Sequence, residues 1–212
     1  MNLFSQHFGG LLDFSGRENR QPFWLWVLTV YILQMVLGMV VMIPIMMAGF
    51  SQIRSVAGND PTYMQDHPEI GQQMAMQAMA PMFKGMMLAS AILSLVFVLL
   101  LAAATVRRLH DSNKSGWWAS PFFFLQIVMP IAYAAIFPGI FEKMGTIQPG
   151  ASPEQVNAAM GPMMQGMMGL SLIGTIAFLI MIVLVVFLCL PGTAGPNRFG
   201  EDPLRPTSQL FR

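Results

Sequence analysis

Charged side chains are scarce in this sequence of 212 residues. Lysine, arginine, aspartate and glutamate make up 10% of it, whereas soluble domains carry about 25%, so the composition excludes an ordinary soluble protein. Eleven basic and ten acidic residues leave a net charge of +1, which does not suit a nucleic-acid binder. The single cysteine, Cys189, excludes a disulfide scaffold and a cysteine-based zinc or iron–sulfur site.

Long apolar runs take the place of the missing charge. Hydrophobic residues make up 55% of the chain and the mean hydropathy is +0.58. A helix needs roughly 20 apolar residues to cross the hydrocarbon layer of a bilayer. Four stretches meet this requirement, at about 23–50, 85–106, 117–141 and 169–190. We therefore expect an all-α, polytopic membrane protein with four transmembrane helices in a single membrane domain, residues 1–212.

Basic residues are concentrated on one side of these spans. The N-terminal segment has two, the loop 107–116 has three and the tail 191–212 has three, whereas the loops 51–84 and 142–168 together have three. Lysine and arginine near span ends are retained in the cytoplasm. We therefore predict that both termini and the loop 107–116 are cytoplasmic, and that the two longer loops are extracytoplasmic.

Apolar residues precede the first span at helical spacing. They predict a short amphipathic helix that lies in the membrane interface, and a frayed terminus that merely touches lipid is the alternative. The residues are Leu3, Phe4, Phe8, Leu11 and Leu12.

Two segments of the chain resemble each other. Residues 78–92 align with residues 159–173 through nine identities in fifteen positions, including Pro81 with Pro162. The simplest interpretation is a duplicated helical hairpin, whose two copies share an orientation because each contains two spans. Convergent composition of interfacial segments is the alternative.

Three motifs lie on the predicted cytoplasmic side. They are Gly16-Arg17-Glu18-Asn19-Arg20 followed by Phe23-Trp24, then Arg107-Arg108-Leu109-His110-Asp111-Ser112-Asn113-Lys114-Ser115-Gly116-Trp117-Trp118, then the segment from Pro191 to Pro203. This trio resembles the bacterial inner-membrane protein family of unknown function numbered 805, over residues 10–50, 85–141, the fourth span and the tail. The resemblance implies a small four-helix protein of the bacterial inner (plasma) membrane, and no activity comes with it. The long, Met-rich outer loops depart from the family's usual pattern, so any role in them would be peculiar to this protein.

The motif residues form a basic and aromatic group at one membrane depth. Clustered cations suit anionic lipid headgroups, and arginine suits phosphate, so the group is a candidate site for anionic lipid or a partner. In the competing interpretation, these cations pair with Glu18, Asp111, Glu201 and Asp202 inside a folded cap. The candidate residues are Gly16, Arg17, Arg20, Trp24, Arg107, Arg108, His110, Asp111, Lys114, Gly116, Trp117, Trp118, Asn197 and Arg198.

Enzymatic activity and ion-coupled transport are both disfavoured. His110 and Asp111 are adjacent in sequence, so they do not readily face one another, and no Ser or Cys nucleophile is specified nearby. We expect no enzymatic activity and no cofactor. The spans contain no charged residue or histidine in their interiors, whereas ion-coupled carriers place ionisable groups there. A small transporter or channel subunit is an alternative function.

Methionine is concentrated in the two outer loops. Thioethers select Cu(I), so Cu(I) binding is a further alternative, although methionine is also a flexible apolar filler. The candidate ligands are Met76, Met79, Met82, Met160, Met163 and Met167. The function that we predict first is non-enzymatic, that of a membrane protein that interacts with lipids, with itself as a homo-oligomer, or with a membrane-protein partner.

Overall fold

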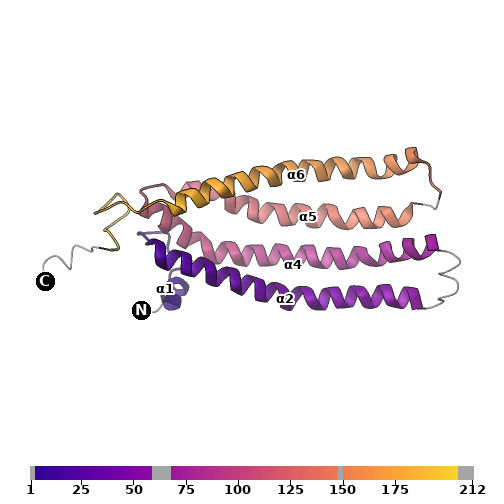
Figure 1. Cartoon of the computed structure of the whole chain (residues 1–212), viewed down its shortest axis with the longest axis horizontal. Helices are drawn as coiled ribbons and strands as arrows, with labels where there is room; N and C mark the ends of the chain where they lie inside the picture. The colour runs from indigo at the N-terminus through magenta and orange to yellow at the C-terminus, as the bar shows by residue number, and fades with distance from the viewer. Residues whose placement is uncertain (1–2, 59–67, 148–149, 205–212) are drawn as a thin grey trace. The chain divides into compact units, whose positions relative to one another are not determined.

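The structure is a computed structural model that describes residues 3–58, 68–147 and 150–204 (Figure 1). Within these ranges it contains helices and no β-strand, which confirms the all-α prediction. The elements in chain order are α1 (Leu3–Gly9), α2 (Arg20–Gly58), α4 (Pro68–Asp111), the 3-10 helix η1 (Gly116–Ala119), α5 (Ser120–Thr146) and α6 (Pro153–Cys189).

Four helices are long and apolar enough to cross a membrane, as the sequence predicts. These segments are Arg20–Gln52, Met79–Asp111, Gly116–Ile140 and Pro153–Cys189. At most 22% of the most apolar part of any of them is buried within the protein, so most of their apolar side chains are left uncovered by the protein itself, as is typical of a membrane-facing surface. The chain is a multi-pass membrane protein.

The helices continue well past the predicted spans. α2 has 39 residues and α4 has 44, and at 1.5 Å per residue each is about twice as long as the hydrocarbon layer is thick. Consequently the predicted loops 51–84 and 142–168 are largely helical where they are described. Helical outer segments are what the Ala- and Met-rich sequence of these loops leads us to expect, because both residue types favour helix.

The chain divides into two compact units, each built from parts of all four long helices. The first comprises Met1–Val36, Leu93–Ile127 and Thr175–Arg212, and the second comprises Leu37–Ile92 and Val128–Gly174. The first unit has a contiguous buried core to which α2, α4 and α6 contribute residues three or four positions apart, the spacing of one helix face. Its members are Phe23, Trp26, Val30, Phe97, Leu101, Ala104, Leu109, Ala119, Leu184 and Leu188.

In the second unit, helices approach each other closely at glycines. A Cβ atom at Gly49 of α2 would lie 2.3 Å from Sδ of Met82 on α4, so a side chain there would have to displace Met82. A Cβ at Gly139 of α5 would lie 3.4 Å from the methyl group of Met163 on α6. Methionine therefore fills the space that a glycine leaves on a neighbouring helix in both hairpins.

The two aligned segments occupy equivalent places in the chain. Residues 78–92 lie in α4 and residues 159–173 lie in α6, each in the second helix of a hairpin, and each helix carries the aligned proline (Pro81 or Pro162) inside it. The motifs at Asn19 and Asn113 each precede the first helix of a hairpin. The duplication stays a prediction, and these equivalent positions agree with it.

The N-terminal helix is present but shorter than the apolar spacing suggests. α1 ends at Gly9, so Leu11 and Leu12 lie beyond it. Two consecutive glycines at positions 9 and 10 explain this end, because glycine is unfavourable in a helix interior. Phe4 and Phe8 are about half exposed on α1, whereas His7 is buried.

Candidate functional site

The end of α4 shows why the central motif forms a turn. Asn113 has a positive φ of 57°, the amide of Lys114 donates to the carbonyl of Leu109 at 2.9 Å, and the amide of Asn113 donates to that of His110 at 3.0 Å. These are the two hydrogen bonds of a Schellman motif, in which asparagine can take the left-handed position. The turn ends α4 at Asp111 and leads directly into η1.

The carboxylate of Asp111 is the centre of a buried ionic cluster. Arg108, one turn earlier on α4, donates from Nη1 to Oδ2 at 2.5 Å. Arg17, from the segment between α1 and α2, donates from Nε and Nη2 to Oδ1 at 3.1 and 3.0 Å. Both pairs are almost wholly buried. Two guanidinium groups thus share one carboxylate, and the charge of the cluster is positive.

Backbone carbonyls accept further hydrogen bonds from the two arginines. Arg108 donates from Nε to the carbonyl of Leu188 at 3.0 Å and from Nη2 to that of Leu190. Arg17 donates to the carbonyls of Thr193 at 2.6 Å and Gly195 at 2.7 Å. Carbonyls at the end of α6 have no helical partner, so the arginines supply the missing donors and fix the segment after α6.

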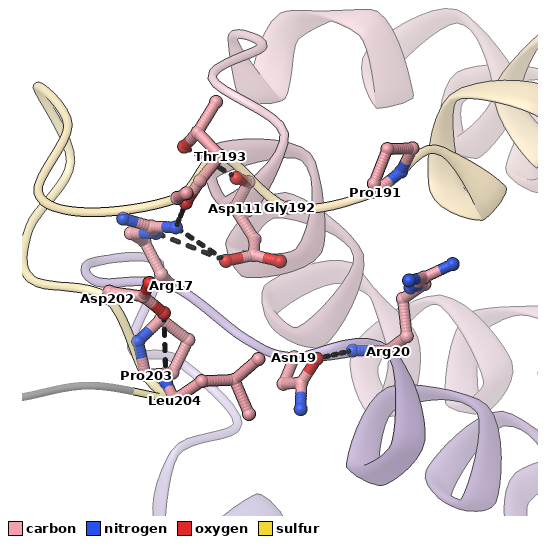
Figure 2. Close-up of a pocket in the computed structure, with 11 residues that line it drawn as sticks. Arg17, Asn19, Arg20, Asp111, Pro191, Gly192, Thr193, Asp202, Pro203 and Leu204 are labelled. Atoms are coloured by element: carbon pink, nitrogen blue, oxygen red, sulfur yellow. Dashed lines mark hydrogen bonds and ion pairs between the residues drawn. The ribbon is translucent and has the colours of Figure 1, made fainter.

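The chain after α6 passes directly over Asp111. The amide of Thr193 donates to the backbone carbonyl of Asp111 at 2.8 Å, and the Thr193 hydroxyl donates to the same oxygen at 3.1 Å. A Cβ atom at Gly192 would lie 2.3 Å from Oδ2 of Asp111. Only glycine fits there, because the carboxylate is already held by two arginines. Figure 2 shows Arg17, Asp111 and Thr193 converging on this point.

A second buried pair holds α1 against the same unit. Glu18 accepts from Nε of Arg107 at Oε2, 3.0 Å away, while its Oε1 lies 2.7 Å from Nε2 of His7. Arg107 also donates to the backbone carbonyls of Gly10 and Asp13. The neighbouring Ser15 donates from its hydroxyl and its amide to the carboxylate of Asp13, which lowers the pKa of that carboxyl.

Tryptophan 26 joins this pair to the apolar core. The His7 ring stacks on Trp26 with centroids 4.6 Å apart and planes 15° apart. The indole Nε1 of Trp26 donates to the carbonyl of Leu100 on α4 at 2.9 Å. His7 is therefore placed by a carboxylate on one side and an indole face on the other.

His110 does not form a catalytic pair with Asp111. Its Nδ1 lies 3.2 Å from the carbonyl of Gly16, and its ring stacks on Phe199 with centroids 3.8 Å apart. The guanidinium of Arg198 lies over the Phe199 ring, 4.6 Å from its centroid. The side-chain amide of Asn197 donates to the His110 carbonyl at 2.9 Å. These contacts attach the tail to the end of α4.

Three cations of this region have no acidic partner among the described residues. Arg20 and Arg198 are exposed, and Lys114 is half-buried with Nζ 4.3 Å from the centroid of Phe187. In Figure 2 the side chain of Arg20 extends from the first residue of α2, and no interaction is drawn to its guanidinium. Trp117 and Trp118, the two central residues of η1, are 80% and 55% exposed. The surface of this end is thus basic and aromatic.

A cavity of about 230 Å³ lies beside Arg20 and the Asp111 cluster (Figure 2). Its lining includes two arginines, Arg17 and Arg20, and two aspartates, Asp111 and Asp202. Asp202 accepts from the amides of Gly195 and Leu204. The balance of charge in the lining does not favour a multiply charged anion inside the cavity, so anions are better accommodated at its exposed rim.

The family model described as "Protein of unknown function (DUF805)" matches residues 11–201 of the chain. The match includes both arginines of the Asp111 cluster and the segment after α6 as far as Glu201. The chain belongs to the DUF805 family. Among curated proteins and among solved structures, none is significantly similar to it.

All fourteen candidate residues of the three DUF805 motifs lie in the first unit. They come from the segment before α2, the start of α2, the end of α4, the turn that follows it, η1 and the segment after α6. We refer to residues 3–20, 107–119 and 188–204 as the cap. Gly16 has a positive φ of 80° just before Arg17, Trp24 packs against Phe23, and Gly116 begins η1. The tail beyond residue 204 lies outside the described residues.

Sequence reasoning missed several residues that hold the DUF805 cap together. Neither His7 nor Trp26 was a candidate, because each makes its contacts across segments that are distant in sequence. Gly192 follows Pro191 within the third motif, so the Pro-Gly pair was a signal for a close turn. The role of Gly192 depends on the position of Asp111, 81 residues earlier, which the pair itself does not indicate.

The methionine candidates lie on two helices, α4 and α6. Met82 and Met163 pack against glycines of neighbouring helices, and Met167 is 39% exposed on α6. Met79 lies on α4 and Met160 near the start of α6, both half-buried. The side chain of Met76 lies outside the described residues. In the described part of the chain, no group of three or more His, Cys, Asp or Glu could hold a metal ion.

Proposed function

We propose that this DUF805 protein is a non-enzymatic, multi-pass protein of the bacterial inner membrane whose cap, on the cytoplasmic side, binds anionic lipid headgroups. Eight of the eleven basic residues lie in the three segments assigned to the cytoplasm, which supports the orientation because lysine and arginine are retained there. The same leaflet carries the negative surface potential that attracts such residues.

The observation that supports headgroup binding is the division of the cations into two groups. Arg17, Arg107 and Arg108 are held in ion pairs with Asp111 and Glu18. Arg20 and Arg198 are exposed and have no ion pair with a described carboxylate. The paired arginines build the cap, and the exposed ones remain available to lipid phosphates.

The exposed tryptophans support the same location. Trp117 and Trp118 lie beside Lys114 at the start of a spanning segment. Indole rings prefer the headgroup level of a bilayer, so the exposed cations are expected at the same depth as lipid phosphates. Arginine can bind a phosphate through two parallel hydrogen bonds.

The occupied side chains of His110 and Asp111 support the absence of catalysis. Asp111 is bound by two arginines, and the His110 ring is held between the Gly16 carbonyl and Phe199. A general base has to reach a substrate proton with its own free nitrogen or oxygen. Neither side chain is arranged to act on the other.

The test compares two pairs of exposed cations in the full-length protein in lipid nanodiscs. The variant Arg20→Gln/Arg198→Gln removes the two exposed arginines of the cap, and the control Arg54→Gln/Lys84→Gln removes two exposed cations from the second unit. Native mass spectrometry measures retained phosphatidylglycerol relative to phosphatidylcholine. At about 1 kcal/mol per cation near the surface, we expect the first variant to lose about thirtyfold in selectivity.

The control should keep the selectivity of the unmodified protein. Equal losses of selectivity in both variants would show that positive charge attracts anionic lipid without a particular site. Unchanged selectivity in both variants would contradict the proposal. The exposed pair is the sharper choice, because substitution of Arg107 or Arg108 would break an ion pair with Glu18 or Asp111 as well as any lipid contact.

A further inference from the structure

An apolar groove lies between the end of α4 and the start of α5, within the first unit. Its volume is about 610 Å³, which falls in the range of about 300–1,000 Å³ typical of ligand sites. α4 contributes residues four positions apart, and α5 contributes residues three or four apart, so each helix lines the groove with one face. The residues are Ala102, Val106, His110, Phe123, Phe124 and Ile127.

The groove changes from polar to apolar along its length. His110, Ser115 and Ser120 line the end at the cap, and the lining from Ala102 and Val106 to Ile127 is apolar. Ala102 and His110 are eight residues apart, about 12 Å along α4. The groove therefore begins at the polar cap and runs along the two spanning segments.

Large apolar side chains at the groove are left uncovered by the protein. Trp117 is 80% exposed at the polar end, and Phe124 is 65% exposed on α5. Both belong to a segment long and apolar enough to cross the membrane. The molecules that surround such a segment are lipids, which are polar at one end and apolar along their chains, as the groove is.

We propose that this groove binds one acyl chain of a membrane phospholipid, with the phosphate of its headgroup at the polar end. The headgroup would meet His110, whose ring stacks on Phe199. The guanidinium of the exposed Arg198 lies over the Phe199 ring, 4.6 Å from its centroid. The stack places a cation behind the polar end of the groove, which complements the charge of a phosphate.

This inference does not depend on the headgroup selectivity proposed above. The groove recognises the chain of the lipid through apolar contact, whereas the exposed cations distinguish anionic from zwitterionic headgroups. A phosphatidylethanolamine chain fits the groove as well as a phosphatidylglycerol chain. Each proposal can therefore fail while the other holds.

The test uses the full-length protein in phosphatidylcholine nanodiscs that contain a small fraction of phospholipid with a diazirine in its acyl chain. The labelled lipid is phosphatidylglycerol in one set and phosphatidylethanolamine in the other. After illumination, peptide mass spectrometry maps the label. We expect both lipids to label residues 102–106 and 120–127 more strongly than the exposed face of α6 at residues 172–179. Even labelling of both regions would overturn the proposal.

A filled groove gives the second measurement. Ala102→Phe should lower labelling of the groove about tenfold, the loss expected when about two methylene groups leave apolar surroundings. Ala135→Phe, at an exposed alanine of α5 outside the groove, should leave it unchanged. If Ala102→Phe does not fold, the map of the unmodified protein still decides. A dimer with an unlabelled groove would assign the groove to a second copy of the chain and overturn the proposal.

Discussion

The carboxylate of Asp111 occupies the space that a side chain at position 192 would need, so it lies directly against Gly192. A Cβ atom there would lie 2.3 Å from Oδ2 of the carboxylate, and that oxygen accepts from Arg108 at 2.5 Å. The segment after α6 can thus close over the ionic cluster only because it has no side chain at this point. The glycine at position 192 of the third motif is therefore required by Asp111, the last residue of α4.

Gly192→Ala should destabilise the cap. The added methyl group would displace the Asp111 carboxylate from a buried ion pair, which costs about 3 kcal/mol when one partner is lost. The midpoint of thermal unfolding in nanodiscs, followed by tryptophan fluorescence, measures the loss. Gly166→Ala on α6 is the control, because nothing lies within 4 Å of a Cβ there and alanine favours helix. Equal effects of the two substitutions would contradict the close contact.

Asp111→Asn should be among the most damaging isosteric changes in the cap. It leaves Arg17 and Arg108 buried together without a negative charge, and breaking a buried pair in this way costs about 3–5 kcal/mol. Glu154→Gln, at an exposed residue in the first turn of α6, removes the same charge as a control and should change stability little. The same unfolding assay compares them, and a stable Asp111→Asn protein would show that the cluster does not hold the cap.

His7→Ala should release α1 from the first unit. The substitution removes the contact with Glu18 and the stacking on Trp26, so α1 loses its polar attachment and the segment before α2 is held less firmly. Trypsin should then cleave at Arg17 and Arg20 faster than in the unmodified protein. Phe4→Ala on the exposed side of α1 is the control and should be cleaved at the original rate. Equal protection of both variants would mean that the apolar residues of α1 alone hold it.

The fold was largely predictable because membrane spanning depends on local composition. A run of about 20 apolar residues has few alternatives in a bilayer, so the four spans follow from the sequence alone. The helix ends did not follow, because helix propensity carries α2 and α4 past the apolar runs. The ends were set by Gly9 and by the turn at Asn113, where the residue type permits a change of backbone conformation.

The membership of the cap was predictable, but its pairing was not. The three motifs contain Arg17, Asp111 and Arg108, and a folded cap of ion pairs was one of two interpretations open for them. Whether a given cation forms an ion pair or remains free to bind lipid depends on which carboxylate, if any, lies within its reach. Arg17 and Asp111 are 94 residues apart, and only the packing of α2 against α4 brings them together. Arg20, three residues from Arg17, has no such partner among the described residues.

The proposed orientation can be measured with single cysteines in a Cys189→Ser background. Leu12→Cys places a thiol at an exposed residue of the cap, and Asn157→Cys places one at an exposed residue of the opposite end of α6. Because basic residues are retained in the cytoplasm, we expect a membrane-impermeant maleimide to label only Asn157→Cys in spheroplasts. Both variants should react after lysis. The reverse pattern would invert the topology.

The side-chain oxygen Oε1 of Gln34, on α2, is buried and has no hydrogen-bond partner. Among the described residues it is the one buried side-chain atom of this kind. An unsatisfied buried acceptor costs about 1–3 kcal/mol, so Gln34→Leu should raise the unfolding midpoint. Gln126→Leu on α5 is the matched control and should give no such gain, because its amide has no buried unpaired atom. A loss of stability in Gln34→Leu would mean that this oxygen has a partner in the membrane, such as water. If the unmodified protein then carried a solute into vesicles and Gln34→Leu abolished that flux, the result would favour the transport alternative over the non-enzymatic lipid-binding role.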